Sequence, residues 1–254
     1  MPPEVMAPAL QACRHCGAGA PPAVHFCPQC SKLLPLGRGL DYFSFFGLPR
    51  RLAIEPGDLE RRFRALSRQL HPDYFYNADP AERRASLERT SYLNDGYRTL
   101  RDPASRLEYL LRLEGVAPTG PGSGGGAREA PAALLEEVFA LNEELEAVRA
   151  LRAAGAPPEQ WKPRLERARR PIEARRAEHE RELASLAARW DACADPAPAR
   201  EPEHAAAAVR GGSGPARGLD DDCRAILTAL RDRLLERRYI ENLLAGIDRE
   251  LAGP

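Results

Sequence analysis

The chain has 254 residues, of which 6% are aromatic, and its 20 Gly and 24 Pro fall in clusters, so we expect small folded units joined by linkers. Its 37 basic and 37 acidic residues cancel, which argues against binding to nucleic acid or to an anionic membrane through bulk charge. No stretch approaches the ~18 to 20 apolar residues of a membrane span, and the opening MPPEVMAPALQAC lacks the features of a signal peptide, so we expect a cytoplasmic protein.

Four cysteines occur in two C-x-x-C pairs near the start of the chain, as CRHC at 13–16 and CPQC at 27–30. Each pair can turn both thiolates toward one ion, and two pairs can close a tetrahedron of sulfurs ~2.3 Å from zinc. Four sulfurs leave no open position, so we predict a structural zinc site and no catalytic cofactor. Iron in a rubredoxin-like site, disulfides and free thiols are the alternatives. The predicted metal ligands are Cys13, Cys16, Cys27 and Cys30.

Two helices are expected after the cysteines. A short aromatic-rich helix fits residues 40–48, which read LDYFSFFGL. The next segment, EPGDLERRFRALSRQL, repeats its apolar residues at intervals of four, three and four, which predicts a helix with one face turned to a core. On the far side, Arg61, Arg64 and Arg68 fall within ~60° of one another and form a basic stripe.

The tripeptide HPD interrupts this helical pattern. The helix should end at Leu70 or His71, because Pro72 disfavours the α conformation in the residue before it. Helical periodicity resumes over residues 81–100, and a further helix is expected to start at Pro103 with Asp102 as its cap. The HPD tripeptide should therefore lie on a loop between two antiparallel helices.

This arrangement, with LNDGYRTLRDP in the third helix, resembles the J-domain of DnaJ-type co-chaperones over residues 41–114. The resemblance implies that the loop and the basic stripe dock on a DnaK-type, seventy-kilodalton heat-shock chaperone and accelerate its ATP hydrolysis. Many relatives carry Lys directly after HPD, whereas this chain has Tyr74. An ordinary inter-helix turn is the alternative, and an enzymatic role of the histidine lacks a neighbouring nucleophile. The implied chaperone-binding residues are His71, Pro72, Asp73, Arg61, Arg64 and Arg68.

A Gly/Pro linker at 115–131 separates this region from three further helical segments. These segments carry heptad-like apolar seams, which predict an antiparallel three-helix bundle, and residues 195–218 interrupt it with a polar, Pro/Ala/Gly-rich excursion. Leu135 and Phe139 lie off the first seam, and Tyr239 is expected to point away from the stripes of the last helix. Such residues either widen the bundle core or hold a client protein.

The whole arrangement resembles the HscB-type co-chaperones of iron–sulfur cluster biogenesis, from DYFSFFGLP at 41 through ERRYIENLLAGID at 236. The resemblance implies that the C-terminal three-helix domain binds an IscU-type scaffold protein. It also relates the four-cysteine front to a metal-binding extension found on eukaryotic members. Glu136 stands where relatives have an apolar residue. The implied scaffold-binding residues are Leu135, Phe139, Glu143 and Tyr239.

We therefore predict an all-α protein with a J-domain helical hairpin and a C-terminal three-helix bundle, preceded by the metal-binding module. The predicted divisions are 1–39 for the module, 40–114 for the J-domain, 115–131 for the linker and 132–254 for the scaffold-binding domain. The predicted function is that of a co-chaperone, not an enzyme. It stimulates the ATPase of a DnaK/HscA-type chaperone and delivers an IscU-type scaffold, with no nucleic-acid or membrane partner. The alternatives are a J-domain protein with another client and a zinc-ribbon nucleic-acid-binding regulator.

Overall fold

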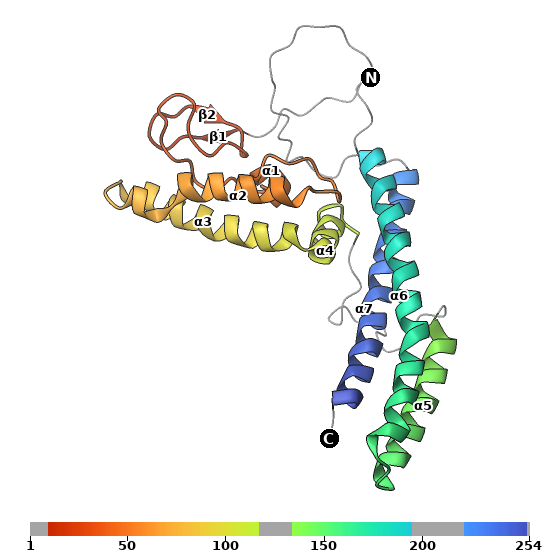
Figure 1. The fold of residues 1–254 in the computed structure, drawn as a ribbon. Helices are drawn as coiled ribbons and strands as arrows, with labels where there is room; N and C mark the ends of the chain where they lie inside the picture. The colour runs from red at the N-terminus through yellow and green to blue at the C-terminus, as the bar shows by residue number, and fades with distance from the viewer. Residues whose placement is uncertain (1–9, 117–133, 195–220, 253–254) are drawn as a thin grey trace. The chain divides into compact units, whose positions relative to one another are not determined.

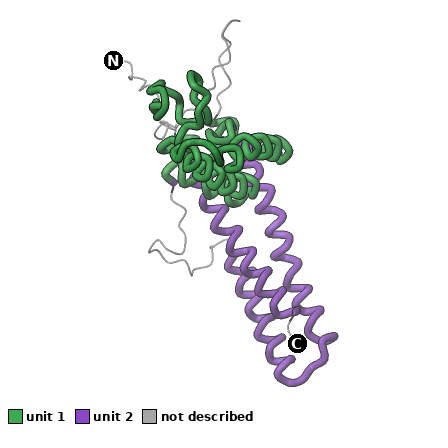
Figure 2. The backbone as a smooth tube through the Cα atoms, turned by 90° about the vertical axis from the view of Figure 1, so that its left-hand side faces the viewer, with its two compact units in different colours: residues 1–115, 190–224 green, residues 116–189, 225–254 purple. Residues whose placement is uncertain are grey.

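The computed structural model describes residues 10–116, 134–194 and 221–252 (Figure 1). The predicted excursion at 195–218 and nearly all of the predicted linker at 115–131 lie outside these residues. The chain divides into two compact units, shown in different colours in Figure 2. Unit 1 comprises 1–115 and 190–224, and unit 2 comprises 116–189 and 225–254.

Unit 1 begins with a small cysteine-bearing module that contains little regular structure. Its two strands, β1 (Gln11–Ala12) and β2 (Gly19–Ala20), pair antiparallel, with Gln11 opposite Ala20. A single bridge joins Phe26 and Leu33 farther along. Around this framework a small apolar cluster is buried, formed by Cys13, Ala20, Cys27 and Leu34.

Four α-helices and one short 3-10 helix follow in unit 1. They are α1 (Tyr42–Phe45), α2 (Pro56–Leu70), the 3-10 helix η1 (Pro72–Phe75), α3 (Pro80–Arg101) and α4 (Pro103–Leu113). Each of α2, α3 and α4 begins with proline after a carboxylate cap, where proline's missing N–H costs nothing. The predicted cap at Asp102 accepts a hydrogen bond of 2.7 Å from Ser105 N.

Helices α2 and α3 lie side by side and antiparallel, as the sequence predicts (Figure 1). Fully buried leucines fill the space between them, among them Leu70, Leu93 and Leu100. Gly96 of α3 faces the rings of α1, and a Cβ there would lie 2.9 Å from Tyr42 Cδ1. The glycine therefore lets α1 pack closely on α3.

Unit 2 is built from α5 (Leu135–Ala153), α6 (Pro158–Ala194) as far as residue 189, and α7 (Asp221–Ala252) from residue 225. The predicted seams form its core, with Leu134, Leu141 and Val148 buried against α6 and α7 residues such as Trp161 and Ile247. Helix α6 continues through both of its internal prolines without a break. The described residues are helical with almost no strand, which confirms the all-α class and the three-helix bundle.

Cys193 and Cys223 form a disulfide, with Cα atoms 6.0 Å apart. Cys223 is buried, and its sulfur is bonded to Cys193. Both residues belong to unit 1, at the end of α6 and the start of α7. Within the described residues, no helix is both long and apolar enough to span a membrane.

Candidate binding surfaces and metal centre

The HPD tripeptide lies in the tight connection between α2 and α3. Helix α2 ends at Leu70, and His71 caps both it and η1 with φ −59° and ψ 131°. The ring nitrogen His71 Nδ1 accepts a hydrogen bond of 3.3 Å from Asp73 N and lies 3.4 Å from Asp73 Oδ2. The Asp73 side chain is 86% exposed and that of His71 is 49% exposed. Both side chains are thus available to a partner, on a backbone held by local hydrogen bonds.

Two side chains of helix α3 donate hydrogen bonds to Leu70, the residue directly before this loop. The buried hydroxyl of Ser86 donates a hydrogen bond of 2.7 Å to Leu70 O, and Thr90 Oγ1 donates a second one of 3.1 Å to the same atom. One helical turn separates the two donors, so they lie on the same face of α3. Neither residue belongs to a motif that marks it in the sequence, although Ser and Thr four positions apart on a core-facing helix can indicate such a contact.

The basic stripe of α2 is exposed at Arg61, Arg64 and Arg68. Arg61 forms an ion pair of 2.7 Å with Asp58, and Arg64 forms one of 2.5 Å with Glu60. Exposed pairs of this kind are weak, so both guanidinium groups can exchange their partners for carboxylates of another protein. Among the described residues, Arg68 has no carboxylate partner, and it stands one turn before His71.

The four cysteines of the module come together as two matched knuckles. Gly17 N donates to Cys13 O and Ser31 N donates to Cys27 O, each at 2.9 Å. All four sulfurs lie within 4.8 Å of one another, with 3.7 Å between Cys13 and Cys30 and 3.6 Å between Cys16 and Cys27. A tetrahedron with metal–sulfur bonds of ~2.3 Å has edges of ~3.8 Å, so this donor set fits one metal ion.

The local backbone favours the thiolate forms of Cys13 and Cys27, one cysteine of each pair. The Cys30 backbone N–H lowers the pKa of the Cys27 thiol to about 6. The Cys16 backbone N–H lowers the pKa of the Cys13 thiol in the same way. Hydrogen-bond donors aimed at a sulfur stabilise its negative charge, and only the thiolate coordinates a metal.

Two buried charged side chains of α3, Glu82 and Arg89, attach the cysteine module to this helix. Glu82 accepts from Lys32 Nζ at 2.9 Å and from Leu33 N at 3.1 Å. Nothing in the sequence pattern marked this residue, because its partners lie about fifty positions away.

Arg89, two turns farther along α3, completes the attachment and is fully buried. It donates to the carbonyl oxygens of Leu34 at 2.7 Å and Pro35 at 2.9 Å, and its Nη1 lies 2.7 Å from His25 Nδ1. Burial lowers the pKa of Arg89 to about 10, and burial followed by the charge of Arg89 lowers that of His25 to about 4. The imidazole is therefore neutral and accepts the hydrogen bond from Arg89.

On unit 2, the predicted off-seam residues of α5 are exposed. Phe139 is 67% exposed and Leu135 is 40% exposed, and Glu143 is exposed beside them. Neither apolar side chain contributes to the bundle core, which excludes the alternative that they only widen it. Tyr239 of α7 is partly buried and packs against that core, so the expectation that it points away from the apolar stripes is wrong.

Comparisons with known proteins point to one group of co-chaperones, although no family model matches the chain. Over 104 residues the chain is 36% identical to the iron-sulfur cluster co-chaperone protein HscB homolog of Arabidopsis thaliana, across 41% of this chain and 40% of that protein. Over 76 residues, or 30% of the chain, it is 47% identical to the co-chaperone protein HscB homolog of Bordetella petrii and 45% identical to that of Chromobacterium violaceum. These matches cover 45% and 43% of the two bacterial proteins. The chain thus aligns with less than half the length of these relatives.

A solved structure shows the shared fold over a longer span. The crystal structure of human co-chaperone protein HscB matches 95% of this chain and 99% of its own with a TM-score of 0.62 at 23% identity. Together with the sequence matches, this confirms the likeness to HscB-type co-chaperones.

Proposed function

We propose that this chain is a co-chaperone that docks on a DnaK/HscA-type chaperone through its HPD loop, stimulates that chaperone's ATPase and delivers an IscU-type iron–sulfur scaffold. The observation that carries the proposal is the exposed His71 and Asp73 pair on a loop clamped by α3. The named relatives support an iron–sulfur co-chaperone role in general.

The docking half of the proposal uses charge and shape together. The guanidinium groups of Arg61, Arg64 and Arg68 steer the loop toward an acidic surface of the chaperone, which raises the rate of association. His71 and Asp73 then make the short-range contacts, and they need no reorganisation because their backbone is already fixed. The chain performs no chemistry in this step, and ATP hydrolysis takes place in the partner.

The scaffold half uses the exposed strip on α5. A rigid phenylalanine with two thirds of its surface in water is a typical anchor of a protein interface, and Leu135 extends it along the helix. Glu143 supplies a polar rim, and Tyr239 is the fourth proposed contact, made through the part of its ring that stays accessible. The strip therefore fits an apolar groove or patch on the scaffold.

We propose zinc as the metal held by Cys13, Cys16, Cys27 and Cys30. Four thiolates at tetrahedral spacing are typical of structural zinc, and they leave no position for a substrate or a water nucleophile. When bound, the ion contributes folding energy to the module. A nucleic-acid-binding role of this module has little support, because one of its few basic side chains, Lys32, is paired with Glu82.

Calorimetric titration of the full-length chain with the IscU-type scaffold of the same genome tests the delivery half. The wild type should bind, and the Leu135→Ala/Phe139→Ala variant should bind roughly a hundredfold more weakly, since two central anchors are lost. The matched control is Glu166→Ala, an exposed glutamate that lies on α6 rather than on α5. If the double variant binds like the wild type, the client of this co-chaperone is not held by α5. The cytoplasmic location stays a prediction, which cell fractionation checks.

A further inference from the structure

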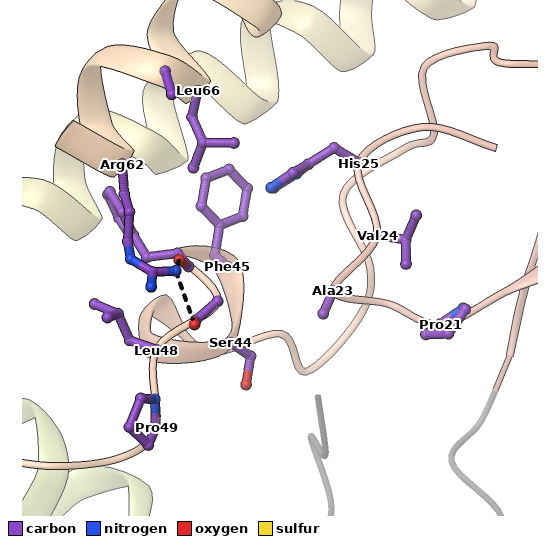
Figure 3. A pocket seen from close by; sticks show the side chains of 13 residues that line it. Pro21, Ala23, Val24, His25, Ser44, Phe45, Leu48, Pro49, Arg62 and Leu66 are labelled. Atoms are coloured by element: carbon purple, nitrogen blue, oxygen red, sulfur yellow. Dashed lines mark hydrogen bonds between the residues drawn. The ribbon is translucent and has the colours of Figure 1, made fainter. Parts of the chain in front are cut away.

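A cleft of about 710 Å³ lies within unit 1, between the cysteine module and the first two helices of the J-domain region (Figure 3). Ala23, Val24 and His25 of the module form one side, and Phe45, Arg62 and Leu66 form the other. His25 and Phe45 meet edge to face, with ring centroids 4.7 Å apart. The cysteine module therefore supplies one wall of the cleft.

The polar groups in the cleft wall are already occupied. Arg62 Nε pairs with Asp58 at 2.9 Å, and its Nη1 donates to the carbonyl oxygens of Phe46 and Gly47. The ring nitrogen His25 Nδ1 lies 2.7 Å from Arg89 Nη1 and is occupied by that contact. Most of the surface left for a ligand is apolar, so the cleft suits an apolar side chain better than a phosphate, a carboxylate or another ion.

The cleft opens beside the basic stripe of α2. Ala65, which lines it, is four residues from Arg61 and three from Arg68. Positions three and four apart are surface neighbours on a helix, so the rim of the cleft continues directly into the stripe. An apolar recess bordered by exposed cations matches an apolar side chain that is flanked by carboxylates.

We infer that this cleft is the apolar part of the chaperone-docking surface, and that the metal module supplies one of its walls. Its occupant is an apolar side chain of the DnaK/HscA-type chaperone, whose acidic neighbours pair with Arg61 and Arg68. The inference rests on the proposed function and deepens it, because it assigns the cysteine module a direct part in partner binding. The basic stripe then sets mainly the rate at which the chaperone associates. The apolar side chain held in the cleft sets mainly the rate at which the chaperone dissociates.

Substitutions of Ala23 test the cleft, because this residue lines it without belonging to the buried cluster around the cysteines. Ala23→Gln fills the recess, and Ala23→Glu fills it and also repels an acidic partner. We expect chaperone affinity to fall roughly fivefold with Ala23→Gln and more than tenfold with Ala23→Glu, mostly through faster dissociation. The control is Gln29→Glu, an equal charge change on an exposed residue of the same module that does not line the cleft.

A photo-crosslinking amino acid gives a second readout that does not depend on affinity. Placed at exposed Pro21 on the rim, it should link the full-length chain to the chaperone, and placed at Gln29 it should not. Metal content and thermal unfolding of each variant show whether the module is intact. Wild-type affinity of both Ala23 variants, with no crosslink at position 21, would overturn the inference even if His71→Gln abolishes stimulation. If the wild type itself fails to bind the chaperone, the proposed function and this inference fall together.

Discussion

Ser86 Oγ on α3 lies 2.7 Å from the backbone carbonyl oxygen of Leu70, the residue directly before His71. Both partners are fully buried, and the bond ties the C-terminal end of α2 to the N-terminal third of the neighbouring helix. Positions 82, 86 and 89 of α3 are all buried, so one face of this helix holds both the HPD loop and the cysteine module. The geometry of the loop thus depends on residues that never touch a partner.

Replacing Ser86 by Ala should make the HPD loop less rigid, although the substituted residue lies outside the loop. The Leu70 carbonyl keeps one donor, Thr90, so the free energy of unfolding should fall by about 1 kcal/mol. Urea unfolding measures this loss, and chaperone stimulation should fall in parallel. The matched control is Ser91→Ala, an exposed serine on the same helix, which should behave like the wild type. An unchanged free energy of unfolding of the Ser86→Ala chain would show that the hydrogen bond from Ser86 to Leu70 contributes nothing to stability.

Arg89→Met should detach the module from α3. Its loss leaves several buried carbonyl oxygens without a donor, which costs on the order of 3 kcal/mol. The exposed Arg84→Met on the same helix is the control and should change stability by less than about 0.5 kcal/mol. Thermal unfolding should separate into an early and a late transition for Arg89→Met alone. A single transition at the wild-type temperature would contradict the attachment.

Thiol counting tests the cysteine assignments together. With the metal removed by a chelator and no reductant added, four thiols should react, because Cys193 and Cys223 are bonded to each other. After reduction all six cysteines of the chain should react. In the Cys193→Ser control the count should be the same before and after reduction. Six reactive thiols without reductant would show that the disulfide does not form.

The bundle should lose stability on mild acidification because of His179. This side chain is buried, its Nε2 lies 3.8 Å from Glu236 Oε2, and Arg233 bridges Glu236 and Glu182 beside it. Burial lowers the pKa of His179 below its usual 6.5, so the unfolded chain binds the proton more readily. The contribution of the neutral, buried His179 to the stability of the bundle is complete above pH 6.5. It is lost as the pH falls below 6.5, because the unfolded chain then takes up the proton first.

Urea unfolding at about pH 7.5 and about pH 5.5 measures this effect. In the His179→Leu chain the free energy of unfolding should differ less between the two pH values. The difference that remains should be the part due to His25, whose pKa is also lowered. Ser91→Ala, a substitution that removes no titratable group, should keep the wild-type slope. An equal slope in the His179→Leu chain would exclude His179 as the cause.

Local patterns in the sequence predicted the helices well. Pro72 marked the end of α2 at Leu70, and the heptad-like seams predicted a bundle core, in which Leu134, Leu141 and Val148 are buried. Both signals act through neighbours in the chain, namely backbone sterics and helical periodicity. The exposure of Phe139 also followed from its place off the seam.

What the sequence did not predict depends on contacts between distant residues. Arg89 looks like any exposed arginine on a helix, but its partners are 54 to 65 positions away. The disulfide joins cysteines 30 residues apart, and Tyr239 packs on a core whose shape needs all three helices. The division into separate module and J-domain stays a prediction, although residues of both lie in one compact unit.

Single-turnover ATP hydrolysis by the DnaK/HscA-type chaperone of the same genome tests the central claim most directly. The full-length wild type should accelerate hydrolysis. The acceleration by His71→Gln should be at least about tenfold smaller, because one side chain of the exposed pair is removed from the docking loop. Glu88→Gln, an exposed residue of α3, should retain it. Equal stimulation by the wild type and His71→Gln would contradict the claim that the HPD loop is the contact through which this chain acts.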